Sequence, residues 1–200
     1  MTSALRDEEA IGERAAIGKA AGGAVMGFGR SLLVLGGARS GKSRHAQAAA
    51  EAAAETVGGE LVFIATAQAF DAEMAARIAR HRADRGGTWR TREAPLDLPA
   101  AIEAEGGPDR VLLVDCLTLW ASNLLLAEHD VEAATEELVQ ALAATAARVV
   151  LVANEVGYGI VPDNALARRF RDVAGTMNQR VAAAVSHVDL VAAGLPLRLK

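Results

Sequence analysis

The sequence predicts an α/β fold built on a doubly wound, mostly parallel β-sheet. Short runs of Val, Leu and Ile alternate with helix-like segments from residue 31 onward, which is the order that a parallel sheet requires. Polar and apolar residues do not alternate within these runs, as is typical of strands buried on both faces. The chain has 200 residues, a usual length for one domain, and 52 % of them are hydrophobic, enough for a sizeable core.

Each element in the first half of the chain has its own local signal. Apolar runs mark the strands, and the first helix is rich in Ala, the residue with the highest helix propensity. Asp71 is a favourable N-cap for the second helix, and Pro95 comes directly before the third. The predicted order is a strand at 32–35, a helix at 43–55, a strand at 61–65, helices at 71–85 and 96–105, and a strand at 111–114.

The second half of the chain contains a long amphipathic helix. Its apolar stripe recurs at helical spacing and consists of Leu166, Phe170, Val173, Met177 and Val181. A Gly-Leu-Pro sequence after the last parallel strand predicts a turn, from which the chain returns along the edge of the sheet. The predicted order is helices at 117–126 and 131–147, a strand at 149–152, the long helix at 164–185, a strand at 188–191, the turn at 194–196 and an antiparallel edge at 197–200.

Residues 1–30 differ in character from the rest of the chain. They are rich in Ala, Gly and charged residues, and their periodicity is weak. We expect a flexible N-terminal extension there, in which 7–20 could form a short helix. Residues 31–200 are expected to fold as a single domain.

Charge, cysteine content and hydropathy exclude several classes of protein. The net charge is −4, which provides no overall attraction for nucleic acid. No apolar run reaches the roughly 18 residues that a membrane span needs. Cys116 is the only cysteine, so no intramolecular disulfide can form, as is typical of a reducing compartment. We therefore expect a cytoplasmic protein with no nucleic-acid partner and no membrane span.

A glycine-rich loop lies between the first predicted strand and the first predicted helix. Its pattern, G-x-x-x-x-G-K-S, lets backbone N–H groups wrap around phosphates, and the helix that follows directs its positive end at the same charge. Lys42 would reach the β- and γ-phosphates, and Ser43 would hold Mg²⁺. The loop consists of Gly36, Gly37, Ala38, Arg39, Ser40, Gly41, Lys42 and Ser43.

An acidic residue at the end of another strand usually fixes Mg²⁺ in such proteins. Asp115 follows the strand at 111–114 and is the candidate here, although it could instead cap the turn that follows. Cys116 beside it is interpreted as a small buried hydrophobe rather than a nucleophile. The fold is therefore predicted to be a RecA-like P-loop NTPase, with 31–200 as its nucleotide-binding catalytic domain. The motif does not distinguish a kinase from an ATPase or a GTPase.

His81 is the histidine with the most suggestive neighbours. On the helix predicted at 71–85, Arg77 and Arg85 lie one turn before and after it and can flank the imidazole. Nearby cations favour the neutral imidazole, which is a nucleophile, and the same arginines can hold a phosphate. The alternative is a structural histidine, because apolar residues share its helix face.

Taken together, these residues resemble the bifunctional adenosylcobinamide kinase / adenosylcobinamide-phosphate guanylyltransferase family of cobalamin biosynthesis. The resemblance covers residues 32–200 and rests on several ordered segments, which makes it more specific than the P-loop alone. The matching segments are 36–45 (GGARSGKSRH), 63–67 (FIATA), 71–78 (DAEMAARI), 81–82 (HR), 89–93 (WRTRE), 154–162 (NEVGYGIVP) and 168–179.

The resemblance implies two reactions in one enzyme. ATP or GTP phosphorylates the terminal hydroxyl of adenosylcobinamide. GTP then guanylylates a histidine, which passes GMP to adenosylcobinamide phosphate and yields adenosyl-GDP-cobinamide, while pyrophosphate leaves. Some family members have a second histidine beside the matching one, but this chain has Arg80 there, which leaves His81 to carry the GMP. The family also implies a homo-oligomer, with a trimer as the expected state.

The resemblance carries further residues over to the site. Lys42 and His81 are the catalytic candidates. Glu93 could accept hydrogen bonds from guanine N1–H and N2–H, unless it is a solvated surface acid. Asn154 and Glu155 could contact the corrinoid or Mg²⁺, or could serve only the turn in which they lie. Besides the P-loop, the nucleotide site is expected to include Ala65, Thr66, Ala67, Arg82, Ala83, Asp84, Arg85, Glu93 and Asp115.

Two other functions are compatible with the sequence. A P-loop kinase of another small metabolite would phosphorylate its substrate without nucleotidyl transfer, and His81 would then be structural. A RecA-like ATPase would instead act as a motor on nucleic acid or in an assembly, and a net charge of −4 does not favour this function. A protein labelled with GMP would distinguish the main prediction from both.

Overall fold

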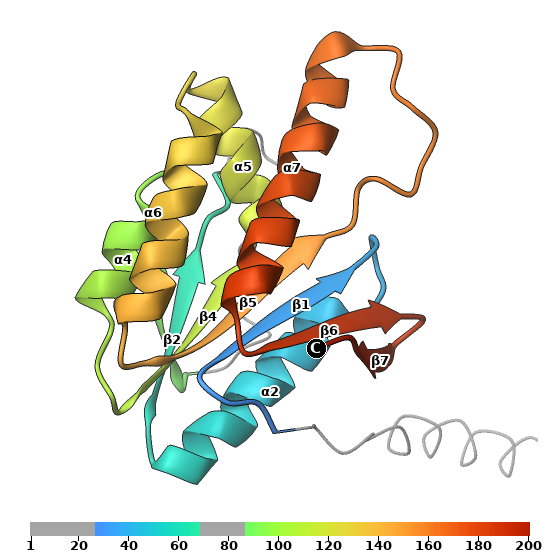
Figure 1. Ribbon diagram of the computed structural model, residues 1–200. Coiled ribbons are helices and arrows are strands. Elements are labelled where there is room, and N and C mark those ends of the chain that lie inside the picture. The colour runs from blue at the N-terminus through green and yellow to red at the C-terminus, as the bar shows by residue number, and fades with distance from the viewer. Residues whose placement is uncertain (1–26, 69–86) are drawn as a thin grey trace, which may run out of the picture.

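A computed structural model describes residues 27–68 and 87–200 of the chain (Figure 1). The strands in these ranges are β1 (Ser31–Gly36), β2 (Glu60–Ala65), β3 (Trp89–Glu93), β4 (Arg110–Asp115), β5 (Arg148–Asn154), β6 (His187–Ala192) and β7 (Leu195–Arg198). The helices are α2 (Lys42–Val57), α4 (Leu98–Ala104), α5 (Leu117–Leu126), α6 (Val131–Ala144) and α7 (Ala165–Ala184). The helix predicted at 71–85 and most of the N-terminal extension lie outside the described residues.

The strands form a single seven-stranded sheet in the order β3-β2-β4-β5-β1-β6-β7. All neighbouring pairs are parallel except β6 and β7, which are antiparallel. The predicted mostly parallel sheet with an antiparallel C-terminal edge is therefore confirmed. β1, which leads into the phosphate loop, lies between β5 and β6, so the loop emerges from the interior of the sheet.

Helices cover both faces of the sheet. α2 packs on one face, and α4, α5, α6 and α7 cover the other (Figure 1). In β1, Leu33 and Leu35 belong to the core beneath the four helices, whereas Leu32 and Val34 face α2. Successive side chains of a strand point to opposite faces, so a strand covered on both sides needs apolar residues at every position. Each such buried side chain contributes about 1.5–3 kcal/mol to folding.

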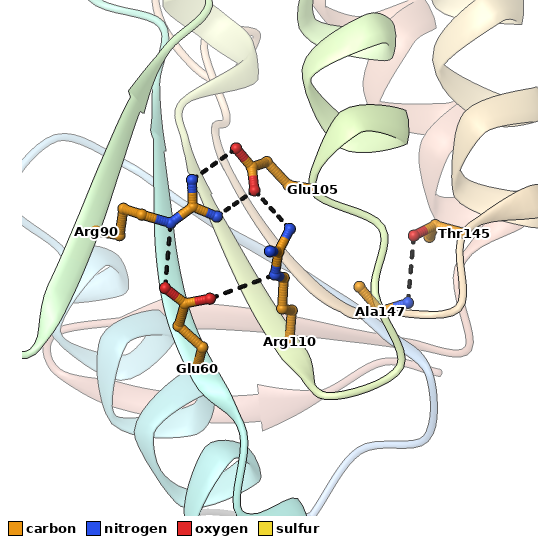
Figure 2. Close-up of polar contacts among 6 residues, drawn as sticks. All are labelled: Glu60, Arg90, Glu105, Arg110, Thr145 and Ala147. Atoms are coloured by element: carbon orange, nitrogen blue, oxygen red, sulfur yellow. Dashed lines mark hydrogen bonds and ion pairs between the residues drawn. The ribbon is translucent and has the colours of Figure 1, made fainter.

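Three helices are shorter than predicted, α7 by only one residue at each end, while α5 has the predicted bounds. α4 begins at Leu98 rather than at residue 96, because Pro99 suits only the first turn of a helix. α6 ends at Ala144 rather than at residue 147. There Thr145 adopts an extended conformation, and its Oγ1 accepts a hydrogen bond of 3.2 Å from Ala147 N (Figure 2).

β3 is a strand that the sequence analysis did not predict. Its residues after Trp89 are polar and exposed, because the strand pairs only with β2 at the edge of the described sheet. The Trp89 ring is buried and packs edge-on against Phe63, with 6.4 Å between the ring centroids. An edge strand does not need the apolar run by which the other strands were found. Trp89 is thus the one apolar anchor of this strand.

Four charged side chains, which we call the charge ring, join β3 to its neighbours at the amino ends of the strands (Figure 2). Arg90 contacts Glu60 at 3.2 Å and binds the Glu105 carboxylate through two guanidinium nitrogens. Arg110 closes the ring, at 2.8 Å from Glu105 and 3.3 Å from Glu60. Glu105 is buried, and its hydrogen bond from Arg90 lowers the pKa of its carboxyl.

The C-terminal hairpin differs slightly from the prediction. Its turn lies at Ala193 and Gly194, which have φ values of 51° and 81°, so it comes earlier than the predicted turn at 194–196. Pro196 belongs to β7, where it pairs with Val191. Proline is tolerated there because an edge strand has one side that forms no ladder hydrogen bonds.

Among the helices within 27–68 and 87–200, none has the length and apolar character of a membrane span.

Candidate active site

The predicted phosphate loop connects β1 to α2, and both motif glycines are required by close contacts. A Cβ on Gly36 would lie 2.5 Å from Ser40 Oγ and 2.7 Å from Val191 O. Gly41 has a φ of 95°, and a Cβ there would lie 3.2 Å from Gly194 Cα. Residues with side chains rarely adopt such a conformation. The backbone path of the loop therefore requires glycine at both of these motif positions.

The residues of this loop differ in their exposure to solvent. The exposed residues are Gly37, Ala38 and Arg39. Ser40 is buried, and its Oγ has no hydrogen-bond partner among the residues that the structure describes. Lys42 Nζ donates to Gly37 O at 3.1 Å, which folds the side chain back over the loop. Ser43 is half-buried in the first turn of α2, the position from which a hydroxyl can reach a phosphate-bound ion.

The β6–β7 hairpin supports the phosphate loop. Gly194 N, in the hairpin turn, donates to Ser40 O at 2.8 Å. Arg198 of β7 donates through Nε to Asp189 of β6, and the same carboxylate binds His45 in the first turn of α2. Asp189 is fully buried. The C-terminal hairpin therefore fixes the backbone on both sides of Gly41.

A second group of predicted residues gathers where β2 and β4 end. Ala65 and Asp115 are register partners, and Thr66 N donates to Asp115 O at 3.4 Å. Thr66 is fully buried, and its Oγ1 both donates to Cys116 O and accepts from Cys116 N, each at 2.8 Å. Its hydroxyl is thus committed to the backbone of Cys116, directly after β4. Ala67 follows, half-buried, at the same edge.

Asp115 and the phosphate loop lie on opposite sides of β5. Asp115 pairs in register with Val152 of β5, and β5 separates β4 from β1. Two strand spacings correspond to about 10 Å. The Ser43 hydroxyl and the Asp115 carboxylate are both oxygen donors, the kind that Mg²⁺ prefers, and Mg²⁺ usually keeps several waters and phosphate oxygens as its other ligands. The pair therefore fits an ion that Asp115 reaches through water.

Asn123 is a supporting residue that the sequence analysis missed. It lies in α5, is 4 % exposed, and donates through Nδ2 to Thr66 O at 2.8 Å and to Pro95 O at 2.9 Å. Trp120 Nε1 donates to Leu96 O at 2.7 Å nearby. These bonds join the segments that follow β2 and β3. The available signal was a lone amide within the apolar run LTLWASNLLL.

Glu93 also lies at the carboxyl ends of the strands, but far from the phosphate loop. It ends β3 in register with Ala65, and it is exposed. The strands β2, β4 and β5 separate β3 from β1. Four strand spacings correspond to about 19 Å. A nucleotide that reaches Glu93 would have to extend along the sheet edge away from Lys42.

The end of β5 adds two polar residues directly beside the loop. Asn154 pairs in register with Gly36, and Glu155 N donates to Gly36 O at 3.2 Å. Among the described residues, the phosphate loop and the carboxyl ends of β2, β4 and β5 thus lie on the same side of the sheet. The remaining predicted site residues lie outside the described residues, and they are His81, Arg82, Ala83, Asp84 and Arg85.

Comparison with known proteins agrees with this geometry. Residues 32–199 match the family model described as "Cobinamide kinase / cobinamide phosphate guanyltransferase". A "Bifunctional adenosylcobalamin biosynthesis protein CobP" from Pseudomonas aeruginosa is 48 % identical over 170 residues, which are 84 % of this chain and 96 % of the relative. Two proteins named "Bifunctional adenosylcobalamin biosynthesis protein CobU" are also similar. The one from Salmonella typhimurium is 46 % identical over 184 residues and the one from Escherichia coli 42 % over 186, each covering 84 % of this chain and 99 % of the relative.

Proposed function

The chain belongs to the cobinamide kinase / cobinamide phosphate guanyltransferase family, and we propose from this that it carries out both reactions on adenosylcobinamide. ATP or GTP first phosphorylates the terminal hydroxyl. GMP from GTP is then transferred to the new phosphate, giving adenosyl-GDP-cobinamide and pyrophosphate. The observation that carries the proposal is the match over residues 32–199, which includes a phosphate loop of the required geometry.

The kinase half uses the phosphate loop. Backbone N–H groups of 36–43 hold the triphosphate, with the N-terminus of α2 behind them. Lys42 exchanges its bond to Gly37 O for the β- and γ-phosphates and stabilises the charge that develops during transfer. The hairpin beneath the loop keeps these donors in place before the nucleotide binds.

Magnesium is the metal ion that these residues fit. Ser43 and Asp115 would hold it, Ser43 directly and Asp115 through water, since β5 lies between them. When bound, the ion would neutralise charge on the phosphate oxygens. The protein's own part is to fix the two oxygen donors, which it does through the start of α2 and the paired ends of β2 and β4.

The guanylyltransferase half uses His81 as the nucleophile. Its imidazole nitrogen attacks the α-phosphorus of GTP, pyrophosphate leaves, and the resulting N–P bond is later broken by the corrinoid phosphate. Arg82 and Arg85 would stabilise charge on the α-phosphate in both steps. Glu93 would select guanine through N1–H and N2–H. Because Glu93 lies far from the phosphate loop, we expect the guanylyl site at the carboxyl end of β3.

Covalent labelling tests this proposal. The protein is incubated with Mg²⁺ and GTP labelled at the α-phosphate, beside a His81→Ala variant and a His129→Ala control, whose histidine is exposed after α5. We expect acid-labile, alkali-stable label on the wild type and the control, and none on His81→Ala. A folded wild type that binds nucleotide but takes up no label would leave a plain small-molecule kinase as the function.

The protein is further proposed to act as a cytoplasmic homo-oligomer, with a trimer as the expected state. Large apolar side chains stand exposed on the loop between β5 and α7 and at the start of that helix, namely Tyr158, Ile160, Val161 and Leu166. Large exposed apolar side chains that are close together in sequence are typical of an interface. Sedimentation equilibrium would measure the mass in solution, and a monomer at micromolar concentration would contradict this part of the proposal.

A further inference from the structure

Glu155 lies directly beside the start of the phosphate loop, at the carboxyl end of β5. β5 pairs with β1 so that Asn154 is the partner of Gly36. The next residue, Glu155, donates its backbone N–H to Gly36 O at 3.2 Å. Ligands of parallel α/β sheets bind beyond the carboxyl ends of the strands, so Glu155 lies on the side of the sheet where a nucleotide held by the loop would bind.

The Glu155 side chain is held by a buried amide. Asn178 of α7 is 7 % exposed, and its Nδ2 donates to Glu155 Oε1 and to Asn154 O, each at 3.2 Å. Both protons of that amide group are therefore used. Asn154 N donates to Thr118 Oγ1 at 2.7 Å, which fixes the backbone before Glu155. The carboxylate is thus oriented in advance, with Oε2 as the oxygen that Asn178 does not occupy.

The other carboxylates near this edge have different positions. Asp189 is buried between His45 and Arg198. Asp115 ends a strand on the other side of β5, and Glu93 ends the strand beyond β2. Within residues 27–68 and 87–200, Glu155 is therefore the acid placed next to the loop.

We propose that Glu155 is the general base of the phosphorylation step and that Asn178 is its positioning residue. The corrinoid hydroxyl oxygen attacks the γ-phosphorus, and a new O–P bond forms. The bond from the γ-phosphorus to the β–γ bridging oxygen breaks, and its electron pair leaves with the nucleoside diphosphate. The hydroxyl proton passes to Glu155 Oε2. This role rests on the proposed function, and such a base typically contributes about 10²–10⁴-fold to the rate.

The test separates the two half-reactions. Glu155→Gln is compared with the wild type and with Glu103→Gln, a matched change of an exposed acid on α4. We expect kcat for adenosylcobinamide phosphorylation to fall about 10²-fold or more in Glu155→Gln, with the nucleotide KM nearly unchanged. GMP labelling of the protein should persist, since it does not need this base. Asn178→Leu should lower kcat by about tenfold, also with little change in KM.

Chemical rescue keeps the proposal falsifiable if Glu155→Gln folds poorly. Formate added to Glu155→Ala should restore part of the lost kcat, because a small carboxylate can occupy the space of the side chain. A purely structural residue would show no rescue. Full kcat in Glu155→Gln would overturn the assignment. So would a loss of nucleotide affinity seen only with Mg²⁺, which would make Glu155 a metal ligand. A folded wild type that phosphorylates no adenosylcobinamide would instead refute the proposed function, and this base with it.

Discussion

His45 Nε2 lies 2.8 Å from Asp189 Oδ2, and this hydrogen bond ties the first turn of α2 to β6. The side chain of Asp189 is only 1 % exposed, and its second oxygen accepts a hydrogen bond from Arg198. A buried carboxylate requires partners of this kind, because an unpaired buried charge is strongly unfavourable. The pair thus couples the helix of the phosphate loop to the end of the chain.

Replacing Asp189 should destabilise the whole domain. In Asp189→Ala, Arg198 loses its partner in a largely buried place, and His45 loses the anchor of its ring. Breaking a buried ion pair by removing one partner typically costs about 3–5 kcal/mol in the free energy of unfolding. Urea denaturation followed by circular dichroism would measure it, with exposed Asp163→Ala as the control. A change below about 0.5 kcal/mol, the usual range for surface sites, would contradict this account.

Lys42→Ala should strongly reduce the rate of phosphorylation while leaving the fold intact. Lys42 Nζ donates a hydrogen bond to the loop backbone at Gly37 O, and the loss of this bond disturbs no core contact. Removal of one electrostatic donor to a transition state costs about 10²–10³-fold in kcat, and we expect at least that here. Steady-state kinetics and the melting temperature would be measured together. The control is Lys200→Ala, a change of an exposed lysine, which should retain wild-type kcat.

Cys116 should be unreactive in the folded protein. Burial, with the nearby Asp115 charge as a smaller cause, raises the pKa of its thiol from 9.0 to about 11. The thiolate is the reactive form, so alkylation by iodoacetamide at pH 8 should be slow until urea unfolds the chain. Because the folded pKa is the higher one, this thiol favours folding below pH 9, and the contribution is lost as pH rises through 11. Mass spectrometry would follow alkylation, and rapid labelling without urea would be inconsistent with a buried thiol.

The charge ring should make stability depend on pH in the acidic range. The hydrogen bond from Arg90 is the main cause that lowers the pKa of Glu105 below its ordinary value of 4.5. A lowered folded pKa means that the stabilisation is complete above 4.5 and is lost as pH falls through the folded value. Glu105→Gln should therefore cost about 1.5–3 kcal/mol at pH 7 and much less at pH 3. The control is Glu103→Gln, and an equal cost at both pH values would argue against the ring as the cause.

The sequence predicted the fold well wherever the structure depends on local pattern. The apolar runs gave the buried strands, and the loop at 36–43 was found together with its strand and helix. β3 was missed because an edge strand paired on one side has little need of apolar residues beyond Trp89. Its existence depends on pairing with β2, which periodicity does not reveal.

The supporting contacts of the site were harder to predict, because their partners are distant in sequence. Asn123 binds backbone carbonyls of two separate segments, and Asn178 reaches Glu155 from the last helix. Gly194 was predicted only as a turn residue, although its N–H holds Ser40 O. Sequence signals were present in some cases, such as a lone Asp189 within the apolar run HVDLVA. They marked a residue as unusual without naming its partner.

The placement of β1 between β5 and β6 has a consequence for synthesis on the ribosome. β1 is translated first among the described strands, yet Ser31 pairs with Val149 and Leu32 with His187. Both neighbours of the nucleotide-binding strand are therefore still untranslated when its loop leaves the exit tunnel. Pairings between strands so distant in sequence form slowly and late. A nascent chain of this enzyme should acquire affinity for nucleotide only when its C-terminal hairpin has been released.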